Sequence, residues 1–141
     1  MAEILMQMDV DAPADRIWSA LSSPEGLRGW WTTHADVDAS AGDVVQLSFP
    51  DAPITWDLRT EDAAEGKRLR WRCVGGPPQW IGTDIAFELD GTDGATRVRF
   101  DHTGWREADE MVRIVTFGWG QILPRLKQYA ETGSPAPFFD F

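Results

Sequence analysis

The chain has 141 residues, of which 43% are hydrophobic and 26% are charged. This size and composition fit one globular domain, residues 1–141, and exclude a largely disordered chain. The formal net charge of −10 repels phosphate backbones, so we expect no nucleic-acid partner. No apolar run reaches the roughly 18 residues that a membrane helix needs, so we expect no membrane insertion.

Cysteine usage and the first residues indicate the compartment. The segment MAEILMQMDVDAP carries no basic leader, which argues against a signal peptide. Cys73 is the one cysteine, so an internal disulfide is excluded. We therefore expect a cytoplasmic protein whose thiol is reduced.

The chain opens with a strand and two short helices. Residues 3–11 alternate apolar and polar side chains, which predicts a strand. Pro13 suits the first turn of a helix over residues 13–21. Ser22-Ser23-Pro24 then ends this helix and starts a second one over residues 24–31.

Six further segments have strand character and are separated by short turns rich in Gly, Pro and Asp, among them SAGD at residues 40–43. They cover residues 33–39, 43–49, 54–62, 67–74, 80–90 and 95–103. Short turns join antiparallel strands, whereas parallel strands need long crossovers. One face of this sheet is apolar, and its expected members are Ile54, Trp56, Leu58, Leu69, Trp71, Cys73, Ile81, Thr83, Ile85, Phe87 and Leu89. The opposite face carries charges of both signs.

A long helix over residues 107–132 completes the domain, with apolar residues at helical spacing. Pro124 removes one helix hydrogen bond, so with Gly118 it predicts a bend over residues 118–124. Gly133 is the expected C-terminal cap. A tail, residues 134–141, follows with three Phe that should not hang free in water. An antiparallel sheet with one apolar face must be covered, and this helix is the element large enough to do so.

Four segments carry a resemblance to a known family: APADRIWSALSSPEGLRGWW, GDVVQLSF, LRWRC and FGWGQILPRLKQYAETG. They resemble the activator of heat-shock-protein ATPase homologue family, which lies in the START, birch-pollen-allergen and polyketide-cyclase superfamily, or SRPBCC. The most telling pieces are the paired Trp30-Trp31 and the step Gly118-Trp119. The resemblance spans residue 3 to about 133.

This resemblance implies an α+β fold of the helix-grip (START-like) type. A curved antiparallel sheet of about seven strands would wrap round the long C-terminal helix, with two short helices after the first strand. It also implies an apolar small molecule, lipid-like or polyketide-like, held between sheet and helix. The eukaryotic co-chaperone of the family resembles this chain in one domain, so a chaperone partner is an alternative implication.

His102 is the sharpest candidate for chemistry. The alternation through TRVRFDHTGW places it on the same side as Phe100, facing the interior. There a neutral imidazole can hydrogen-bond a ligand or relay a proton. A histidine satisfied by a backbone carbonyl is the competing interpretation, since the sequence names no partner for a general base. His34 reads as an exposed loop residue, or as a contact at the mouth of the cavity.

The other candidates for chemistry are weaker. Two isolated histidines do not make a metal site, and no phosphate-binding or dinucleotide motif is present, so we expect no metal and no cofactor. Cys73 beside Trp71 reads as an inert buried thiol.

The charged residues of the strands read as surface ion pairs. Asp84 and Asp101 fall on the outer face, and Asp84 is expected to pair with an arginine across the strands unless a bulge at Gly82 turns it inward. The alternating arginines of residues 68–72 should form exposed ion pairs with neighbouring carboxylates.

We therefore predict a domain that binds an apolar small molecule in an indole-rich cavity, rather than an enzyme. The expected lining residues are Trp56, Trp71, Phe87, Phe100, His102, Met111, Val115, Trp119 and Ile122. One alternative is a small cyclase, aromatase or hydrolase that uses His102. Another is a co-chaperone-like interaction domain that uses the aromatic tail and the acidic surface. Clustered Phe residues at a terminus dock on their own domain or across a dimer, so a homodimer is a further alternative.

Overall fold

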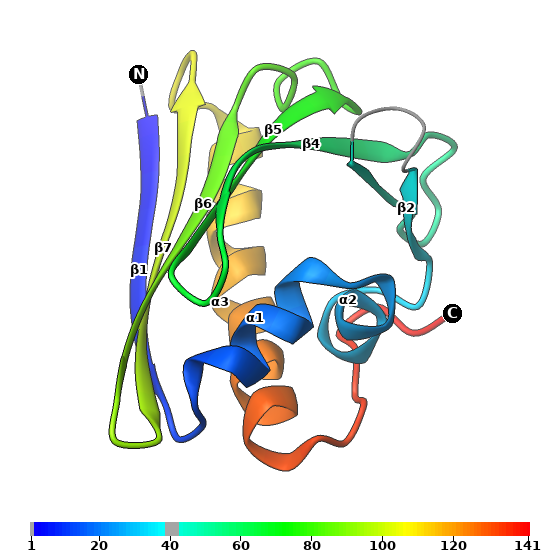
Figure 1. The fold of residues 1–141 in the computed structure, drawn as a ribbon. Coiled ribbons are helices and arrows are strands. Elements are labelled where there is room, and N and C mark those ends of the chain that lie inside the picture. Colours follow the sequence, from blue (N-terminus) through cyan, green and yellow to red (C-terminus); the bar gives the residue numbers. More distant parts are fainter. Residues whose placement is uncertain (1, 39–42) are drawn as a thin grey trace.

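The structure, a computed structural model, describes residues 2–38 and 43–141. Its elements in chain order are β1 (Ala2–Val10), α1 (Ala14–Ser22), α2 (Pro24–Trp30), β2 (Ala35–Asp38), β3 (Val44–Leu47), β4 (Trp56–Ala64), β5 (Arg68–Gly75), β6 (Asp84–Thr92), β7 (Ala95–Trp105) and α3 (Glu110–Thr132). A curved sheet lies along α3, and α1 and α2 lie across one end (Figure 1). The turn expected over residues 40–43 falls mainly outside the described residues.

The sheet is an open meander of β2 to β7, and the first strand is added at the edge beside β7. Within the described residues, seven strands are ordered β1-β7-β6-β5-β4-β3-β2, and each neighbouring pair is antiparallel. The predicted curved antiparallel sheet, long terminal helix and two early helices are therefore confirmed. β1 lies beside β7, and this pairing places Ile4 opposite His102.

The apolar face of the sheet is the core side. Leu69, Trp71 and Cys73 of β5 are at most 4% exposed. Ile85 and Phe87 of β6 are likewise buried. Since side chains alternate along a strand, the arginines between them are directed to the outer face.

One predicted strand starts later than expected. Residues 80–83 form a turn rather than the beginning of β6, and Gly82 has a φ of +91°. The amide of Trp80 donates to the carbonyl of Pro77 (2.9 Å), which closes the turn after Pro77-Pro78. The turn leaves Ile81 42% exposed, so its expected place on the apolar face was wrong. Ile54 precedes β4 and is 45% exposed, so its expected place on the apolar face was also wrong.

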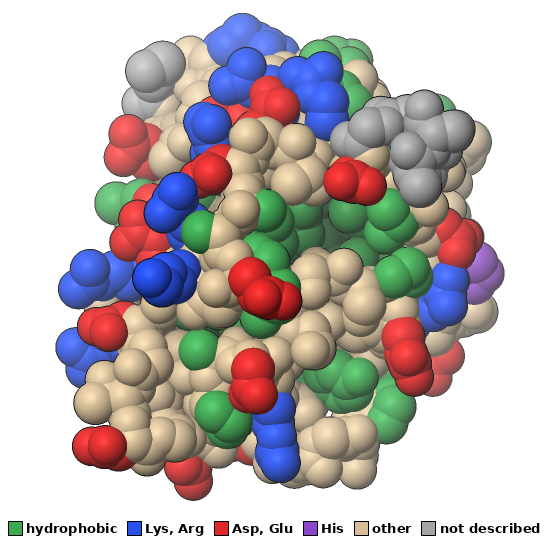
Figure 2. All heavy atoms as spheres, in the orientation of Figure 1, with side chains coloured by type: hydrophobic (Ala, Val, Ile, Leu, Met, Phe, Trp, Pro, Cys, Tyr) green, Lys and Arg blue, Asp and Glu red, His purple; other side chains and the backbone are tan. Residues whose placement is uncertain are grey.

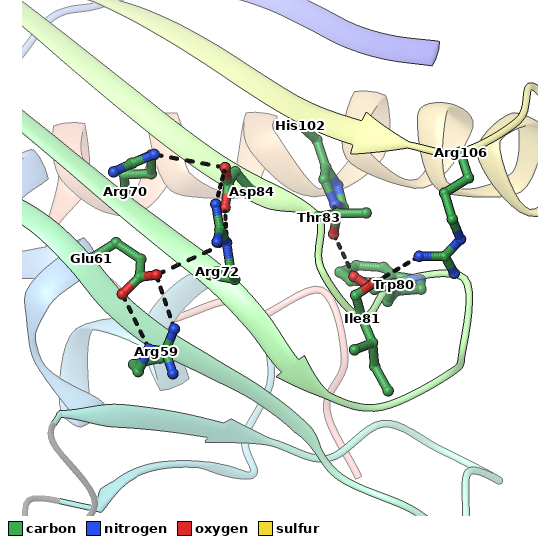
Figure 3. Close-up of polar contacts among 10 residues, drawn as sticks. All are labelled: Arg59, Glu61, Arg70, Arg72, Trp80, Ile81, Thr83, Asp84, His102 and Arg106. Carbon is green, nitrogen blue, oxygen red and sulfur yellow. Dashed lines mark hydrogen bonds and ion pairs between the residues drawn. The ribbon is translucent and has the colours of Figure 1, made fainter. Parts of the chain in front are cut away.

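Ion pairs lie on the outer face of the sheet, and Figure 3 shows those of Arg70 and Arg72 with Asp84. Arg72 lies directly across from Asp84 and donates to both carboxylate oxygens, at 2.9 and 3.1 Å. Arg70 approaches the same carboxylate at 3.7 Å, and Arg68 pairs with Asp62 at 2.6 Å. The predicted cross-strand partner of Asp84 and the ion pairs of these arginines are confirmed.

Side-chain and glycine caps define the ends of α3. Its N-cap is Asp109, whose side chain accepts from the amide of Val112 (3.3 Å), so the helix starts three residues later than predicted. The helix continues through Pro124, and the carbonyl of Gly120 that loses its partner is at the surface. The left-handed Gly133, with φ +75°, caps the C-terminus as predicted. Among the described helices none is long and apolar enough to cross a membrane.

The C-terminal tail is packed on its own domain. The amides of Phe138 and Phe139 donate to the carbonyls of Trp30 and Trp31, at 3.0 and 2.9 Å. The amide of Thr33 donates back to Phe139 at 3.0 Å, so the tail runs beside the end of α2 like a short strand. The expectation that its Phe side chains would not hang free in water is confirmed for Phe138 and Phe139, which pack against the core, whereas Phe141 is 50% exposed.

Candidate ligand-binding cavity

An open cavity of about 270 Å³ lies between the N-terminal half of α3 and the segment that leads into β4. Aromatic side chains form much of its wall, and the rest is aliphatic, proline or glycine. The lining residues are Trp31, Phe49, Pro50, Ala52, Trp56, Trp80, Met111, Ile114, Val115, Gly118, Trp119, Ile122 and Phe139. Ile114 is 61% exposed, so the cavity reaches the surface at α3. Among the described residues, none with a charged side chain lines it.

Three tryptophans fill the centre of the space between sheet and helix. Trp31 stacks on Trp71 with ring centroids 6.3 Å apart and packs against Trp119 at 5.0 Å. All three are at most 2% exposed. The interior is therefore closed in the middle, and the open space lies around this group.

Two smaller cavities lie on other sides of the same group. One, of about 160 Å³, lies between α3 and the strands β1 and β7 and shares the wall residue Trp119. The other, of about 230 Å³, lies between α1 and the strands β2 to β5 and shares Trp71. Figure 2 shows hydrophobic side chains gathered in a hollow on the face that carries α1 and α2.

His102 sits in a closed chain of hydrogen bonds behind the cavity wall. The indole Nε1 of Trp119 donates to His102 Nδ1 at 3.1 Å. Because Nδ1 accepts, the proton of the neutral ring is on Nε2, which donates to Thr83 Oγ1 at 2.9 Å. Thr83 in turn donates to the carbonyl of Trp80 at 2.7 Å (Figure 3). Both ring nitrogens are thereby satisfied.

Burial fixes the charge state of this histidine. His102 has no exposed surface, and desolvation of the charged ring lowers its pKa to about 3, although Asp84 acts in the opposite direction. The ring is therefore neutral at physiological pH. It holds Trp119 in place and has no free nitrogen for a ligand.

The nine expected lining residues divide between the cavity and the closed interior. Those that line the main cavity are Trp56, Met111, Val115, Trp119 and Ile122. Trp71 and Phe100 lie in the interior and reach only the two smaller cavities. Phe87 and His102 are buried in the core and line none of these three cavities.

Several lining residues were not among those predicted. Trp31 and Phe139 come from the end of α2 and from the tail, and Phe49 and Pro50 come from the loop after β3. The spacing of apolar residues predicts helices and strands, so it gives no information on which residues of loops and tails line a cavity. The aromatic character of the tail was the one sequence signal available for Phe139.

The remaining candidates for chemistry are structural. Cys73 is 1% exposed, its thiol donates to the carbonyl of Gly75, and burial raises its pKa to about 11. His34 is exposed and stacks on Phe141 with ring centroids 4.1 Å apart. Asp101 is on the outer face, where desolvation and the nearby Glu88 raise its pKa. The described residues hold no group of three or more His, Cys, Asp or Glu that is able to bind a metal ion.

A curved antiparallel sheet that holds a long helix beside an apolar cavity defines a helix-grip domain of the SRPBCC superfamily. The family model described as "Activator of Hsp90 ATPase homolog 1-like protein" matches residues 11–131. The chain belongs to this family.

Solved structures agree with this assignment. The solution structure of the Aha1 dimer from Colwellia psychrerythraea is 28% identical, with a TM-score of 0.82, over 94% of this chain and 98% of that one. DynU16, from the dynemicin biosynthetic locus, is 24% identical with a TM-score of 0.77. The match covers 99% of this chain and 51% of DynU16. MLL2253 from Mesorhizobium loti is 20% identical with a TM-score of 0.75, over 90% and 95% of the two chains. The last two likenesses show the fold alone. No curated protein matches the chain.

Proposed function

We propose that this domain binds a neutral, apolar small molecule, aromatic or lipid-like, in the cavity between α3 and the start of β4. The observation that carries the proposal is the lining: four Trp and two Phe line about 270 Å³ together with seven further uncharged residues. Small-molecule sites are concave and mainly apolar, and this cavity is slightly smaller than their usual range of volumes.

The charges of the domain favour a neutral ligand over an anionic one. The described residues place no cation in the cavity wall, so a carboxylate or sulfonate there would lose its hydration without gaining a partner. The net charge of −10 adds a long-range repulsion on approach. A fatty acid would therefore bind less well than an uncharged molecule of the same size.

Binding accounts for His102 better than catalysis does. A general base needs a nitrogen that is free to reach the substrate, and both nitrogens of this buried ring are engaged. Orientation of the ligand would instead use Trp56, whose buried Nε1 has no hydrogen-bond partner among the described residues. A turn of its ring would offer this donor to one acceptor atom on the ligand.

A matched pair of probes tests the proposal. N-phenylnaphthylamine is neutral and fluoresces in apolar surroundings, and anilinonaphthalene sulfonate has the same ring system with one added negative charge. We expect a saturable fluorescence rise with the neutral probe and a much weaker one with the sulfonate. The proposal is wrong if neither probe responds and native mass spectrometry of the purified protein finds no added small molecule.

We also propose that the chain forms a homodimer. The similar protein from Colwellia psychrerythraea is a dimer in solution. On α3, Phe117 and Ile114 are 71% and 61% exposed, and large apolar side chains so close together on a surface favour an interface. Light scattering should give twice the monomer mass for the wild type and the monomer mass for Phe117→Glu. The same change at Leu5, 63% exposed on β1, is the control that should leave the dimer intact.

The co-chaperone alternative has less support in the geometry. The aromatic tail that such an interaction would use already contacts α2 and the residues after it.

We further propose a cytoplasmic location, where the one cysteine would stay reduced.

A further inference from the structure

Two glycines flank the tryptophan that divides the cavities. Gly118 lines the main cavity, Gly120 lines the smaller one beside β1, and Trp119 between them lines both. Residues 118–120 lie in the middle of the length of α3. Glycine is less favourable than alanine at such positions because it loses more backbone freedom on folding.

Nothing in the packing of α3 requires glycine at position 118. Its φ is not in the left-handed region, and beyond its chain neighbours and the backbone of the adjacent helical turns, a Cβ built there meets no atom of the described residues within 4 Å. The contrast is Gly29 of α2, where a Cβ would lie 2.5 Å from the ring of Tyr129 and glycine is a steric necessity. The space in front of Gly118 is therefore empty in this structure and belongs to the cavity.

We propose that Gly118 determines the size and shape specificity of the cavity, because the missing side chain lets a flat aromatic ligand lie directly on the backbone of α3. This inference rests on the proposed function and adds the residue that sets the ligand class. Glycine is the residue that permits close approach of a ligand to the backbone. The aromatic wall supplied by Trp56, Trp80 and Trp119 offers edge and face contacts to such a ring.

Stepwise filling of this space tests the inference. Gly118→Ala and Gly118→Leu place one and four carbon atoms in the cavity, and both residues are good helix formers. We expect the affinity for N-phenylnaphthylamine to fall by about threefold and by more than about tenfold, respectively. We expect Gly118→Ala to raise the melting temperature by roughly 2–4 °C, since the helix gains and nothing clashes.

Gly120→Ala and Gly120→Leu are the matched controls. They make the same changes two residues away, on the other side of Trp119, and should leave the affinity for the probe unchanged. If wild type binds the probe and Gly118→Leu binds it equally well, the inference is overturned while the proposed function stands. If Gly118→Leu does not fold, the space is not open and the inference is likewise overturned. If wild type binds neither probe nor any carried-over molecule, both fail.

Discussion

His102 is a connecting residue whose two nitrogens join two different parts of the cavity wall. Through Nδ1 it holds Trp119 of α3, and through Nε2 it holds Thr83, which fixes the turn that carries Trp80. A histidine can do both in its neutral form because one nitrogen accepts while the other donates. The alternation along β7 predicted that the ring faces inward, but it gave no information about these partners, which come from other elements.

Replacement of His102 by Phe should destabilise the fold without blocking it. The ring is similar in size, but the buried indole N–H of Trp119 loses its acceptor, which costs about 1–3 kcal/mol. Urea unfolding measures the loss. The same substitution at the exposed His34 should change the free energy of unfolding by less than about 0.5 kcal/mol, and equal losses at both positions would contradict the assignment.

The charge state of His102 predicts an acid-sensitive stability. Its pKa is about 3 in the folded protein and near 6.5 when unfolded, so between these values the unfolded chain binds the extra proton. The free energy of unfolding should therefore fall as pH is lowered from about 6 to about 5, by up to roughly 1.4 kcal/mol per pH unit. In His102→Phe this slope should vanish, as measured by urea unfolding at several pH values. An unchanged slope would mean that other groups cause it.

At the scale of elements, the segment over residues 76–83 contributes Trp80 to the cavity wall, and Arg106 holds this segment from the outside. Arg106 donates to the carbonyl of Ile81 at 3.1 Å and to that of Pro78 at 2.6 Å (Figure 3 shows the first of these). Arg106 follows directly after β7, so these two hydrogen bonds join the turn to the end of the neighbouring strand.

Loss of these two hydrogen bonds should loosen the turn locally. In Arg106→Gln we expect the amides of Trp80 and Gly82 to lose about tenfold in protection from hydrogen exchange, with little change elsewhere. Arg99→Gln removes a similar exposed contact, with Gln7, and serves as the control that leaves the turn protected. Uniform loss of protection in both variants would show that the effect is global.

The sequence predicted most elements because their periods are set by burial on one face. Strand β5 alternates arginine with buried Leu69, Trp71 and Cys73, and the structure has that same alternation. The prediction failed at residues 80–83, where a turn happens to alternate too, and its hydrogen bonds depend on Pro77. Cavity residues on α3 were predictable from helical spacing. Trp31 and Phe139 were not, because contacts between segments more than a hundred residues apart leave no local period.

At the scale of the whole molecule, the tail completes the cavity that the sheet and α3 begin. Phe139 packs edge-on against Phe49 with ring centroids 4.9 Å apart, so the last residues of the chain close one side of the wall. The space for a ligand therefore depends on segments from almost the full length of the chain.

Phe139→Ser should weaken both the fold and the probe affinity. The side chain is partly buried, so we expect a loss of about 1–3 kcal/mol in the free energy of unfolding, less than for a fully buried Phe. Phe141→Ser, at a residue that is 50% exposed, should stay within about 0.5 kcal/mol of wild type. Chemical unfolding and probe titration of the two variants provide the measurement, and identical behaviour would contradict a role of the tail in the wall.

The state of Cys73 makes the protein well suited to site-specific labelling. Its thiol is buried and keeps its proton well above neutral pH, so we expect that maleimide reagents do not react with it. A cysteine introduced at exposed Pro50, which lines the cavity outside the proposed dimer interface, would then be the single reactive thiol on the chain. A polarity-sensitive dye attached there would report the entry of a guest directly, without removal of the native sulfur.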